Sequence, residues 1–148
     1  MSRAKPVSER NPYDFYATPE WCYEQLDFPF HLFETAHEPC RGDGRIVTFL
    51  ENKGLTVTST EIREGEVELA PAVAGDLVML LRINFLGSKK RYNFWKKNPA
   101  AAIYVLTKRP SFTGKGTDAT EYAWFVWQKK EYIKPGIHHM KPPNLKKV

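Results

Sequence analysis

The sequence predicts an α/β fold with a mostly parallel sheet and an antiparallel hairpin near its C-terminal end. Segments with strand patterns alternate with segments of helical pattern between residues 18 and 99. The run DLVMLLRINF at 76–85 is continuously apolar, which is typical of a parallel strand buried on both faces. Two apolar segments, 100–109 and 121–130, then follow each other without a helix between them, which indicates a hairpin. The length of 148 residues fits one domain with a single modest core.

The N-terminal elements are predicted from their boundary residues. Thr18-Pro19-Glu20 is typical of a helix start, because Thr caps the first N–H groups, Pro suits the first helical position and an acid suits the first turn. This helix continues through 21–26. Residues 31–39 are predicted as a strand, and 45–54 as an amphipathic helix that ends at a glycine. The alternating, β-branched residues 55–62 predict the next strand.

The C-terminal half contains longer apolar segments separated by basic ones. After 62–75, which includes a short helical piece interrupted by Pro71, comes the strand 76–85. Residues 87–99 are predicted as a basic amphipathic helix ended by a proline, and 110–120 as a surface loop rich in Gly, Ser and Thr. The expected organisation is a flexible leader at 1–13, a domain at 14–130 and an irregular basic tail at 131–148.

Composition narrows the function classes. The chain is 42% hydrophobic, and no apolar run approaches the roughly 20 residues that span a bilayer. The N-terminal residues lack the apolar segment of a secretory signal. Two cysteines, Cys22 and Cys40, make no disulfide framework, so we expect a cytoplasmic protein. Cys40 as a nucleophile would need a partner histidine, and none is implied nearby. The adjacent pair His138-His139 has no Cys or carboxylate at ligand spacing, so no metal is expected.

The net charge of +5 is concentrated in three segments, 89–97, 108–116 and 134–148. The first two mix basic residues with aromatic ones. This mixture suits nucleic acid, because phosphates take the charge and bases stack on the rings. The alternative is a solvated helix face followed by a basic tail.

The segment EPCRGDG at 38–44 joins a predicted strand to a predicted helix. A glycine-rich turn of this kind lets the backbone approach a ligand, and the helix N-terminus offers free N–H groups. The next strand ends at Glu61, seventeen residues after Gly44, where an acid can bind two ribose hydroxyls. The pattern therefore indicates a nucleoside site. A tight turn without a ligand and a solvated acid at a strand end are the alternatives.

The type of nucleoside depends on the spacing of the glycines. A dinucleotide fingerprint requires a third glycine at the position held by Val47. Acid-Pro-x-x-Gly-x-Gly instead resembles the first motif of S-adenosylmethionine-dependent DNA methyltransferases. DFYATPEW at 14–21 resembles the segment that precedes this motif in the adenine-N6 enzymes. LLRINFLGSKKRYNFW and VLTKRPSFTGKGTDATEYAWFVW resemble the last third of a compact group often encoded by phages or prophages. These four blocks occur in the expected order between residues 14 and 128.

This resemblance implies a Rossmann-like methyltransferase sheet, S-adenosylmethionine as cofactor, DNA as partner and adenine N6 as the methylated atom. The residues implied for the cofactor are Tyr16, Thr18, Pro19, Glu38, Cys40, Gly42, Gly44 and Glu61. The residues predicted for DNA, from the basic clusters and the resemblance, are Asn84, Lys89, Lys90, Arg91, Arg109, Ser111, Phe112, Thr113 and Lys115. Tyr122 and Trp124 are placed by the resemblance near the target-base pocket, and packing in the core or at a sheet edge is the alternative for each.

The chain departs from this family at the catalytic signature, an Asn or Asp followed by Pro-Pro and an aromatic residue. Its only Pro-Pro pair lies in KPPNL at 141–145, and only the fourteen residues 62–75 separate Glu61 from Asp76. The expected sheet is therefore shortened in the middle, and no catalytic residue is assigned. Asn84 is one candidate substitute. Either the printed sequence omits a segment or the protein is a natural or engineered deletion, so a methyltransferase and an inactive relative that binds cofactor or DNA remain alternatives.

Overall fold

The computed structural model describes residues 17–61 and 75–143. The predicted leader, the helical piece before residue 75 and the proposed cofactor residue Tyr16 lie outside the described residues. In chain order the elements are α1 (Trp21–Glu24), η3 (Phe30–Leu32), β1 (Thr35–Glu38), α2 (Arg45–Asn52), β2 (Thr56–Ser59), β3 (Leu77–Arg82), η5 (Ile83–Leu86), η6 (Lys89–Arg91), α3 (Tyr92–Lys97), β4 (Ala102–Val105), β5 (Tyr122–Trp127) and β6 (Gly136–His139).

A compact β–α–β unit is formed by β1, α2 and β2. The two strands are parallel, with Thr35 opposite Thr56 and Glu38 opposite Ser59. Helix α2 begins directly after the turn at 39–44 and returns the chain across the strands. The strand, turn, helix and strand predicted for this region are confirmed, although the first strand is shorter because 30–32 form a 3₁₀ turn. Local sequence patterns suffice here because β1, α2 and β2 follow one another directly and the two strands pair with each other.

The prediction of one mostly parallel, Rossmann-like sheet is wrong. The described strands form two sheets, β1–β2 and a four-stranded sheet of order β3–β5–β4–β6. In the larger sheet β3 and β4 both run antiparallel to β5, and only β6 is parallel to its neighbour. Among the described strands, β3 therefore pairs with the C-terminal hairpin and not with β1 or β2.

The physical reason lies in β5, which is the most buried of the described strands. Ala123, Phe125 and Val126 are fully inaccessible to solvent. A strand with apolar side chains on both faces needs neighbours on both edges and cover on both faces, and β3 and β4 provide the edges. The prediction of a parallel strand buried on both faces at 76–85 is wrong, because β3 pairs antiparallel with β5 and Leu77 and Met79 are exposed on it. A continuous apolar run thus did not reveal the direction of its partner.

The tail predicted to be irregular contributes an edge strand. Residues 136–139 form β6, which pairs in parallel with β4 and places Ile137 opposite Ile103. The ring of His138 stacks on Tyr104 with ring centroids 4.9 Å apart. The two histidines thus belong to the sheet. In the described ranges, no group of three or more His, Cys, Asp or Glu residues is arranged to hold a metal ion.

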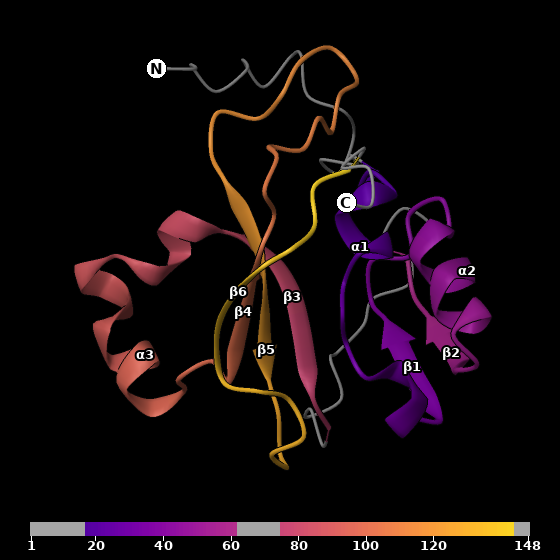
Figure 1. Ribbon diagram of the computed structural model, residues 1–148, viewed down its shortest axis with the longest axis horizontal. Coiled ribbons are helices and arrows are strands. Elements are labelled where there is room, and N and C mark those ends of the chain that lie inside the picture. The colour runs from indigo at the N-terminus through magenta and orange to yellow at the C-terminus, as the bar shows by residue number, and fades with distance from the viewer. Residues whose placement is uncertain (1–16, 62–74, 144–148) are drawn as a thin grey trace.

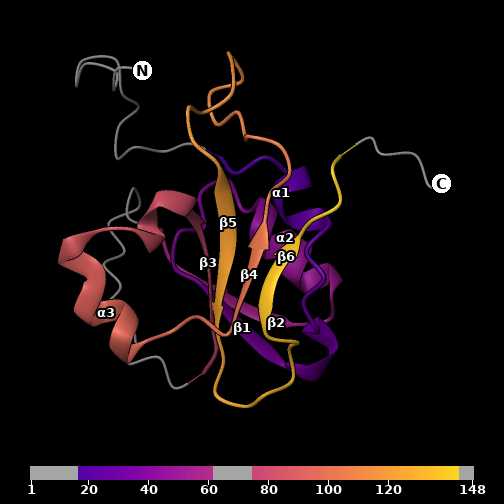
Figure 2. The same cartoon turned by 60° about the vertical axis from the view of Figure 1, so that its left-hand side comes forward.

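The larger sheet separates two layers (Figure 1). Helix α1 and the β–α–β unit lie on one side, and α3 lies on the other; Figure 2 shows the same arrangement with the strands side by side. Successive residues of β5 point to opposite faces. Trp124 belongs to the cluster that includes α1, whereas Phe125 contacts Trp95 of α3.

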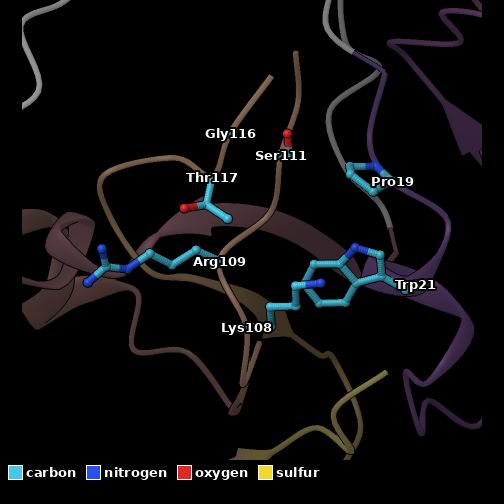
Figure 3. A pocket seen from close by; sticks show the side chains of 7 residues that line it. All are labelled: Pro19, Trp21, Lys108, Arg109, Ser111, Gly116 and Thr117. Carbon is cyan, nitrogen blue, oxygen red and sulfur yellow. The ribbon is translucent and has the colours of Figure 1, made fainter. Parts of the chain in front are cut away.

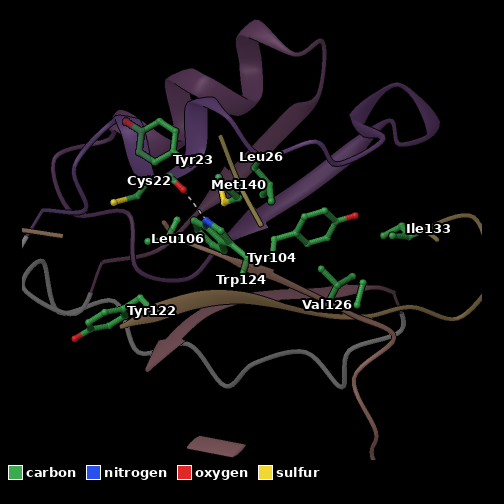
Figure 4. Close-up of a cluster of buried hydrophobic side chains, with 11 residues drawn as sticks. Cys22, Tyr23, Leu26, Tyr104, Leu106, Tyr122, Trp124, Val126, Ile133 and Met140 are labelled. Atoms are coloured by element: carbon green, nitrogen blue, oxygen red, sulfur yellow. Dashed lines mark hydrogen bonds between the residues drawn. The ribbon is translucent and has the colours of Figure 1, made fainter. Parts of the chain in front are cut away.

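The main core lies between α1 and the sheet (Figure 4). Cys22, Tyr23 and Leu26 pack against Tyr104 and Trp124. The indole N–H of Trp124 donates to the carbonyl oxygen of Cys22 at 2.7 Å, across 102 positions of sequence. This buried hydrogen bond joins the N-terminal segment to the centre of the larger sheet. It supports the alternative of core packing for Trp124, away from a base pocket.

The second layer is aromatic. Trp95 lies parallel to Trp127 with centroids 6.0 Å apart, and its indole N–H donates to the carbonyl of Phe85 at 3.1 Å. The basic helix predicted at 87–99 is divided into η6 and α3, because the Ser88 side chain accepts the N–H of Lys90 and starts a separate turn. The layer therefore covers one sheet face with rings while its lysines remain at the surface.

The two cysteines are expected to differ sharply in reactivity. Cys22 is inaccessible to solvent, and burial raises the pKa of its thiol to about 12, whereas Cys40 is exposed. Only the thiolate reacts with iodoacetamide, so at pH 8 Cys40 should be labelled fully while Cys22 is labelled only after unfolding. Peptide mass mapping of the native and the urea-unfolded protein measures both rates. Equal labelling in the native state would contradict the packing of α1 on the sheet.

A search for membrane-spanning helices, made over residues 17–61 and 75–143, finds none that is long and apolar enough.

Candidate cofactor and nucleic-acid site

The turn between β1 and α2 contains two glycines with left-handed backbone conformation. Gly42 has φ +59° and Gly44 has φ +86°, both in the left-handed region that side chains with a Cβ rarely adopt. The N–H of Gly44 donates to the carbonyl of Arg41, and the carbonyl of Gly44 accepts the N–H of Thr48 as the first bond of α2. The sequence prediction of a glycine turn that leads into a helix is thus confirmed.

Residue Thr60, just after β2, is hydrogen-bonded to this turn. The N–H of Arg41 donates to the carbonyl of Thr60 at 3.0 Å, and the N–H of Thr60 donates to the carbonyl of Glu38 at 3.1 Å. The hydroxyl of Thr60 also donates to the carbonyl of Pro39 at 3.2 Å. The carboxyl ends of both parallel strands therefore meet at the turn, which is where ligands bind in open α/β sheets.

Glu61 is the buried acid of this region. Its side chain is 4% exposed, and one carboxylate oxygen accepts the N–H of Gly42 at 2.7 Å. The alternative of a solvated strand end is therefore excluded. A buried carboxylate requires hydrogen-bond donors, and the backbone of the turn supplies one. The arrangement suits an acid facing ribose hydroxyls, and it equally suits a brace that holds the turn to β2.

Glu38 and Cys40 lie at the start of the turn. A carboxylate oxygen of Glu38 accepts the backbone N–H of Cys40 at 2.8 Å, which closes a tight bend after β1. The side chain of Cys40 is exposed. Together with Gly42, Gly44 and Glu61, these residues form one continuous group, so the structure brings together five of the eight predicted cofactor residues.

The larger cavity near the turn has a volume of about 760 Å³ and lies between α1 and α2. Asp43 and Gly44 line the end of it that adjoins the turn, and Glu20 and Tyr23 line the wall from α1. Its size falls within the range of small-molecule sites. Glu38 and Glu61 do not line it. The cavity thus reaches the helix side of the turn and not the strand ends.

A smaller cavity of about 370 Å³ lies between α1 and the loop that joins β4 to β5 (Figure 3). Pro19 and Trp21 line it from the N-terminal segment, the Lys108 side chain lies against Trp21, and Ser111 and Thr117 lie across from them. Here the structure brings together Pro19, predicted for the cofactor, and Arg109 with Ser111, predicted for DNA. Thr18 is half-buried beside this wall but does not line the cavity.

The loop of residues 110–118 is anchored at its base. The N–H of Asp118 donates to the carbonyl of Pro110 at 2.8 Å, and the Asp118 carboxylate accepts the phenolic O–H of Tyr122 at 2.8 Å. Burial raises the pKa of Tyr122, so this phenol keeps its proton. The Nε of Arg82 donates to the same phenol oxygen at 3.0 Å, and Phe112 packs edge-on against the Tyr122 ring at 5.2 Å. Tyr122 therefore positions the loop from its buried place on β5.

The remaining residues predicted for DNA are dispersed. Thr113 and Lys115 are exposed on the loop, and Asn84 is exposed in η5 just after β3. Lys89, Lys90 and Arg91 lie in η6 on the α3 side of the sheet, where the Arg91 guanidinium sits 4.7 Å from the centroid of Phe85. None of these residues lines the smaller cavity. The structure thus does not unite them with Arg109 and Ser111 in one site.

Sequence reasoning missed Trp21, Lys108, Gly116 and Thr117, which line the smaller cavity. Lys108 and Gly116 each adjoin a predicted residue, and Trp21 ends the block at 14–21, but the sequence assigned no role to any of the four. The signal is spatial, because the packing of α1 on β4 and β5 brings position 21 to the loop.

Comparison of the chain with models of protein families, with curated proteins and with solved structures finds no match to any of them.

Proposed function

We propose that this chain binds S-adenosylmethionine at the turn between β1 and α2 and uses it to methylate adenine N6 in DNA. The observation that carries the proposal is the contact between the Glu61 carboxylate and the N–H of Gly42 at 2.7 Å. It combines an acid at the end of one strand with a glycine turn at the end of its parallel neighbour. Both belong to the sequence pattern that resembles S-adenosylmethionine-dependent enzymes.

The residues present suit the chemistry of this cofactor. The Glu61 carboxylate accepts the N–H of Gly42, and carboxylate oxygens are the acceptors that ribose hydroxyls require. The two left-handed glycines keep the backbone free of Cβ atoms on the ligand side. Bound S-adenosylmethionine supplies a methyl group already activated by its sulfonium. The chain then has to hold the cofactor and to orient the acceptor amine, since in-line positioning supplies much of the rate.

A protein that binds the cofactor or DNA without methyl transfer is the second candidate. The observation that favours it is the absence of an Asn/Asp-Pro-Pro-aromatic tetrapeptide from the sequence. That motif orients the exocyclic amine of a flipped adenine in the resembled enzymes, and Asn84, which is exposed just after β3, is the one candidate substitute that the sequence offers.

Two measurements on the full chain test the proposal. Titration calorimetry with S-adenosylmethionine, and with S-adenosylhomocysteine, is expected to show binding to one site. Transfer of a radiolabelled methyl group to duplex DNA of mixed sequence is then expected, with label recovered as N6-methyladenine. Binding without transfer would favour the second candidate, and no binding of either compound would overturn the donor site.

Replacing Glu61 by glutamine tests whether the Glu61 carboxylate contributes to cofactor binding. The amide keeps the size of the side chain and one acceptor, but it loses the charge that strengthens hydrogen bonds to hydroxyls. We expect the dissociation constant for S-adenosylmethionine to rise at least about tenfold, equal to about 1.4 kcal/mol. Glu51→Gln on the exposed side of α2 is the matched control. An unchanged affinity in Glu61→Gln would remove Glu61 from the cofactor site, and a lowered melting temperature in the same variant would leave it only its role as a brace.

A further inference from the structure

Strand β3 forms one edge of the four-stranded sheet (Figure 2). Within residues 17–61 and 75–143, no strand pairs with its outer side. A strand edge of this kind presents a row of N–H and C=O groups that can pair with another strand, and proteins protect such edges with charges, prolines, bulges or very short strands. The run LVMLL at 77–81 contains no charge and no proline, and β3 pairs with β5 in unbroken register. The edge is therefore long, regular and unprotected.

The opposite edge of the sheet differs. Strand β6 has only four residues, begins with Gly136 and ends with two histidines. A short strand offers few backbone groups to a partner, and the glycine and the polar side chains make it a poor template. Of the two edges, β3 is thus the one that offers an extended apolar strand.

Alternate residues of β3 direct their backbone groups to the outer side. One position beyond the strand, the N–H of Ile83 donates to the carbonyl of Glu121 at 3.0 Å, and the register places these two residues opposite each other. Hydrogen-bonded residues alternate along an antiparallel ladder, so Met79 also directs its backbone groups to β5. Val78 and Leu80 therefore direct their N–H and C=O groups away from β5.

Apolar side chains are exposed beside this edge. Leu77 is 36% exposed and Met79 is 41% exposed. They lie opposite Trp127 and Phe125 in the register, so they belong to the sheet face on which α3 packs. The apolar layer on that face therefore extends to the edge, where a further strand would cover it.

The two ends of β3 carry opposite charges. Asp76 precedes the strand, and Arg82 is its last residue. When two copies of this segment are placed antiparallel with full overlap, Met79 lies opposite its own copy and Asp76 lies opposite Arg82 of the second copy. The same register places Val78 opposite Leu80, and both direct their backbone groups outward, so the hydrogen bonds are in phase. The edge is thus complementary to itself in length, hydrogen bonding and charge.

Both charged side chains already have contacts within the chain. The Asp76 carboxylate accepts the N–H of Lys129 at 2.7 Å. The Arg82 guanidinium donates to Tyr122 at 3.0 Å and to Asp118 at 3.5 Å. A carboxylate and a guanidinium each have several hydrogen-bonding positions, and 57% of the Arg82 side chain is exposed, so a further partner is possible. Exposed pairs of this kind add little affinity, but they determine the register.

We propose that two copies of this chain associate through β3 into a two-fold symmetric dimer in which the two four-stranded sheets become one. The two-fold axis passes by Met79 perpendicular to the sheet, which is the self-complementary geometry of a closed dimer. Backbone hydrogen bonds join Val78 of each copy to Leu80 of the other, and the exposed Leu77 and Met79 side chains form cross-strand contacts. An axis in this direction relates like faces, so α3 of each copy lies on the same face of the joined sheet.

Analytical ultracentrifugation of the full chain over a wide range of protein concentration tests the association. The average mass should rise with concentration toward twice that of the 17.1 kDa chain. Met79→Lys places like charges opposite each other at the axis, and we expect the dissociation constant of the dimer to rise at least about tenfold. Ile137→Lys makes the same kind of change at an exposed position of β6 and should leave this constant unchanged. A mass that stays at one chain, or an equal loss in both variants, would overturn the proposal.

Cysteine cross-linking tests the register. Cys40→Ser removes the exposed native thiol, and Cys22 is buried. In this background Met79→Cys should form an intermolecular disulfide on oxidation with diamide, because non-hydrogen-bonded pairs have Cα atoms about 4.5 Å apart. Leu77→Cys is the matched control on the same face, since its two copies lie about 14 Å apart along the strands, too far for a disulfide. Cross-linking of Leu77→Cys, or none of Met79→Cys, contradicts the proposed dimer.

A synthetic peptide with the sequence of residues 76–82 separates a second copy from another extended strand as the occupant. An excess of peptide is expected to dissociate the dimer, because it pairs with the same edge. A chain that is monomeric at every concentration and still binds the peptide would show that the edge accepts a lone strand, which would refute the dimer. If circular dichroism shows that Met79→Lys does not fold, the cross-linking variants decide.

Discussion

Replacing Trp124 by alanine is expected to lower the free energy of unfolding by about 3–5 kcal/mol. The side chain is 9% exposed and lies in the main core cluster, so its removal leaves a cavity between α1 and the sheet. It also removes the indole N–H that the Cys22 carbonyl accepts. Because small domains have only about 5–15 kcal/mol of stability in total, this change should bring the protein close to unfolding. Urea denaturation followed by circular dichroism measures it.

A pair of milder variants isolates the hydrogen bond. Trp124→Phe and Trp127→Phe each remove an indole N–H that donates to a backbone carbonyl, from Cys22 and from Asn98 respectively. The first bond is buried and the second is exposed, so water can replace only the second. We expect a loss of about 1–3 kcal/mol for Trp124→Phe and of less than about 1 kcal/mol for Trp127→Phe. Equal losses would show that Trp124 acts through packing alone.

Replacing Gly42 by valine is expected to abolish the binding of S-adenosylmethionine. The residue has φ +59°, where a β-branched residue is strained by roughly 1–2 kcal/mol. Its N–H also donates to the Glu61 carboxylate at 2.7 Å, so a shift of the turn moves the acid with it. Calorimetry of the variant against S-adenosylmethionine measures the effect.

Gly54→Val is the control for backbone strain. Gly54 has φ +92° after the end of α2, and a Cβ added there meets no atom within 4 Å. The two variants should therefore lose similar stability, while only Gly42→Val loses the cofactor. Retained affinity in Gly42→Val would remove the turn from the binding site, and loss of affinity in both variants would assign the effect to general strain.

The part of the fold that could be predicted is the part built from near neighbours in sequence. The turn at 39–44, the helix after it and strand β2 were predicted from glycines, amphipathic spacing and alternating β-branched residues. The hairpin of β4 and β5 was likewise predicted and confirmed, because the two apolar segments follow each other with no helical pattern between them. In each case the contacts that define the element lie within a few dozen residues.

The direction and order of strand pairing could not be predicted in the same way. An apolar run such as 77–82 has the same pattern whether its partner runs parallel or antiparallel. The edge strand β6 is formed by residues 136–139, which have a weak strand pattern and pair only because β4 offers a free edge. The alternation of strand and helix patterns and the continuous apolar run at 76–85 indicated a parallel sheet, the resemblance to methyltransferases implied the same, and both led to the wrong fold class.

In the candidate site, too, the residues close in sequence could be predicted and those brought together by the fold could not. The glycine turn and Glu61 were predicted from spacing, Glu38 was implied by the resemblance, and the structure brings them together in one turn. The burial of Glu61 was not predicted, because it depends on how the turn folds back over the end of β2. Trp21 and Lys108 were missed as cavity residues, because they are far apart in the sequence and only the fold brings them together.

The local β–α–β unit and its turn follow from the sequence alone, because the backbone preferences of glycine and the spacing of apolar residues act over short stretches of the chain. Only the tertiary structure decided that β5 is the centre of a mixed sheet, that the tail closes its edge and that α1 meets the loop at 110–118 to form a cavity. These features depend on which apolar surfaces cover each other, and that is decided by the packing of the whole chain.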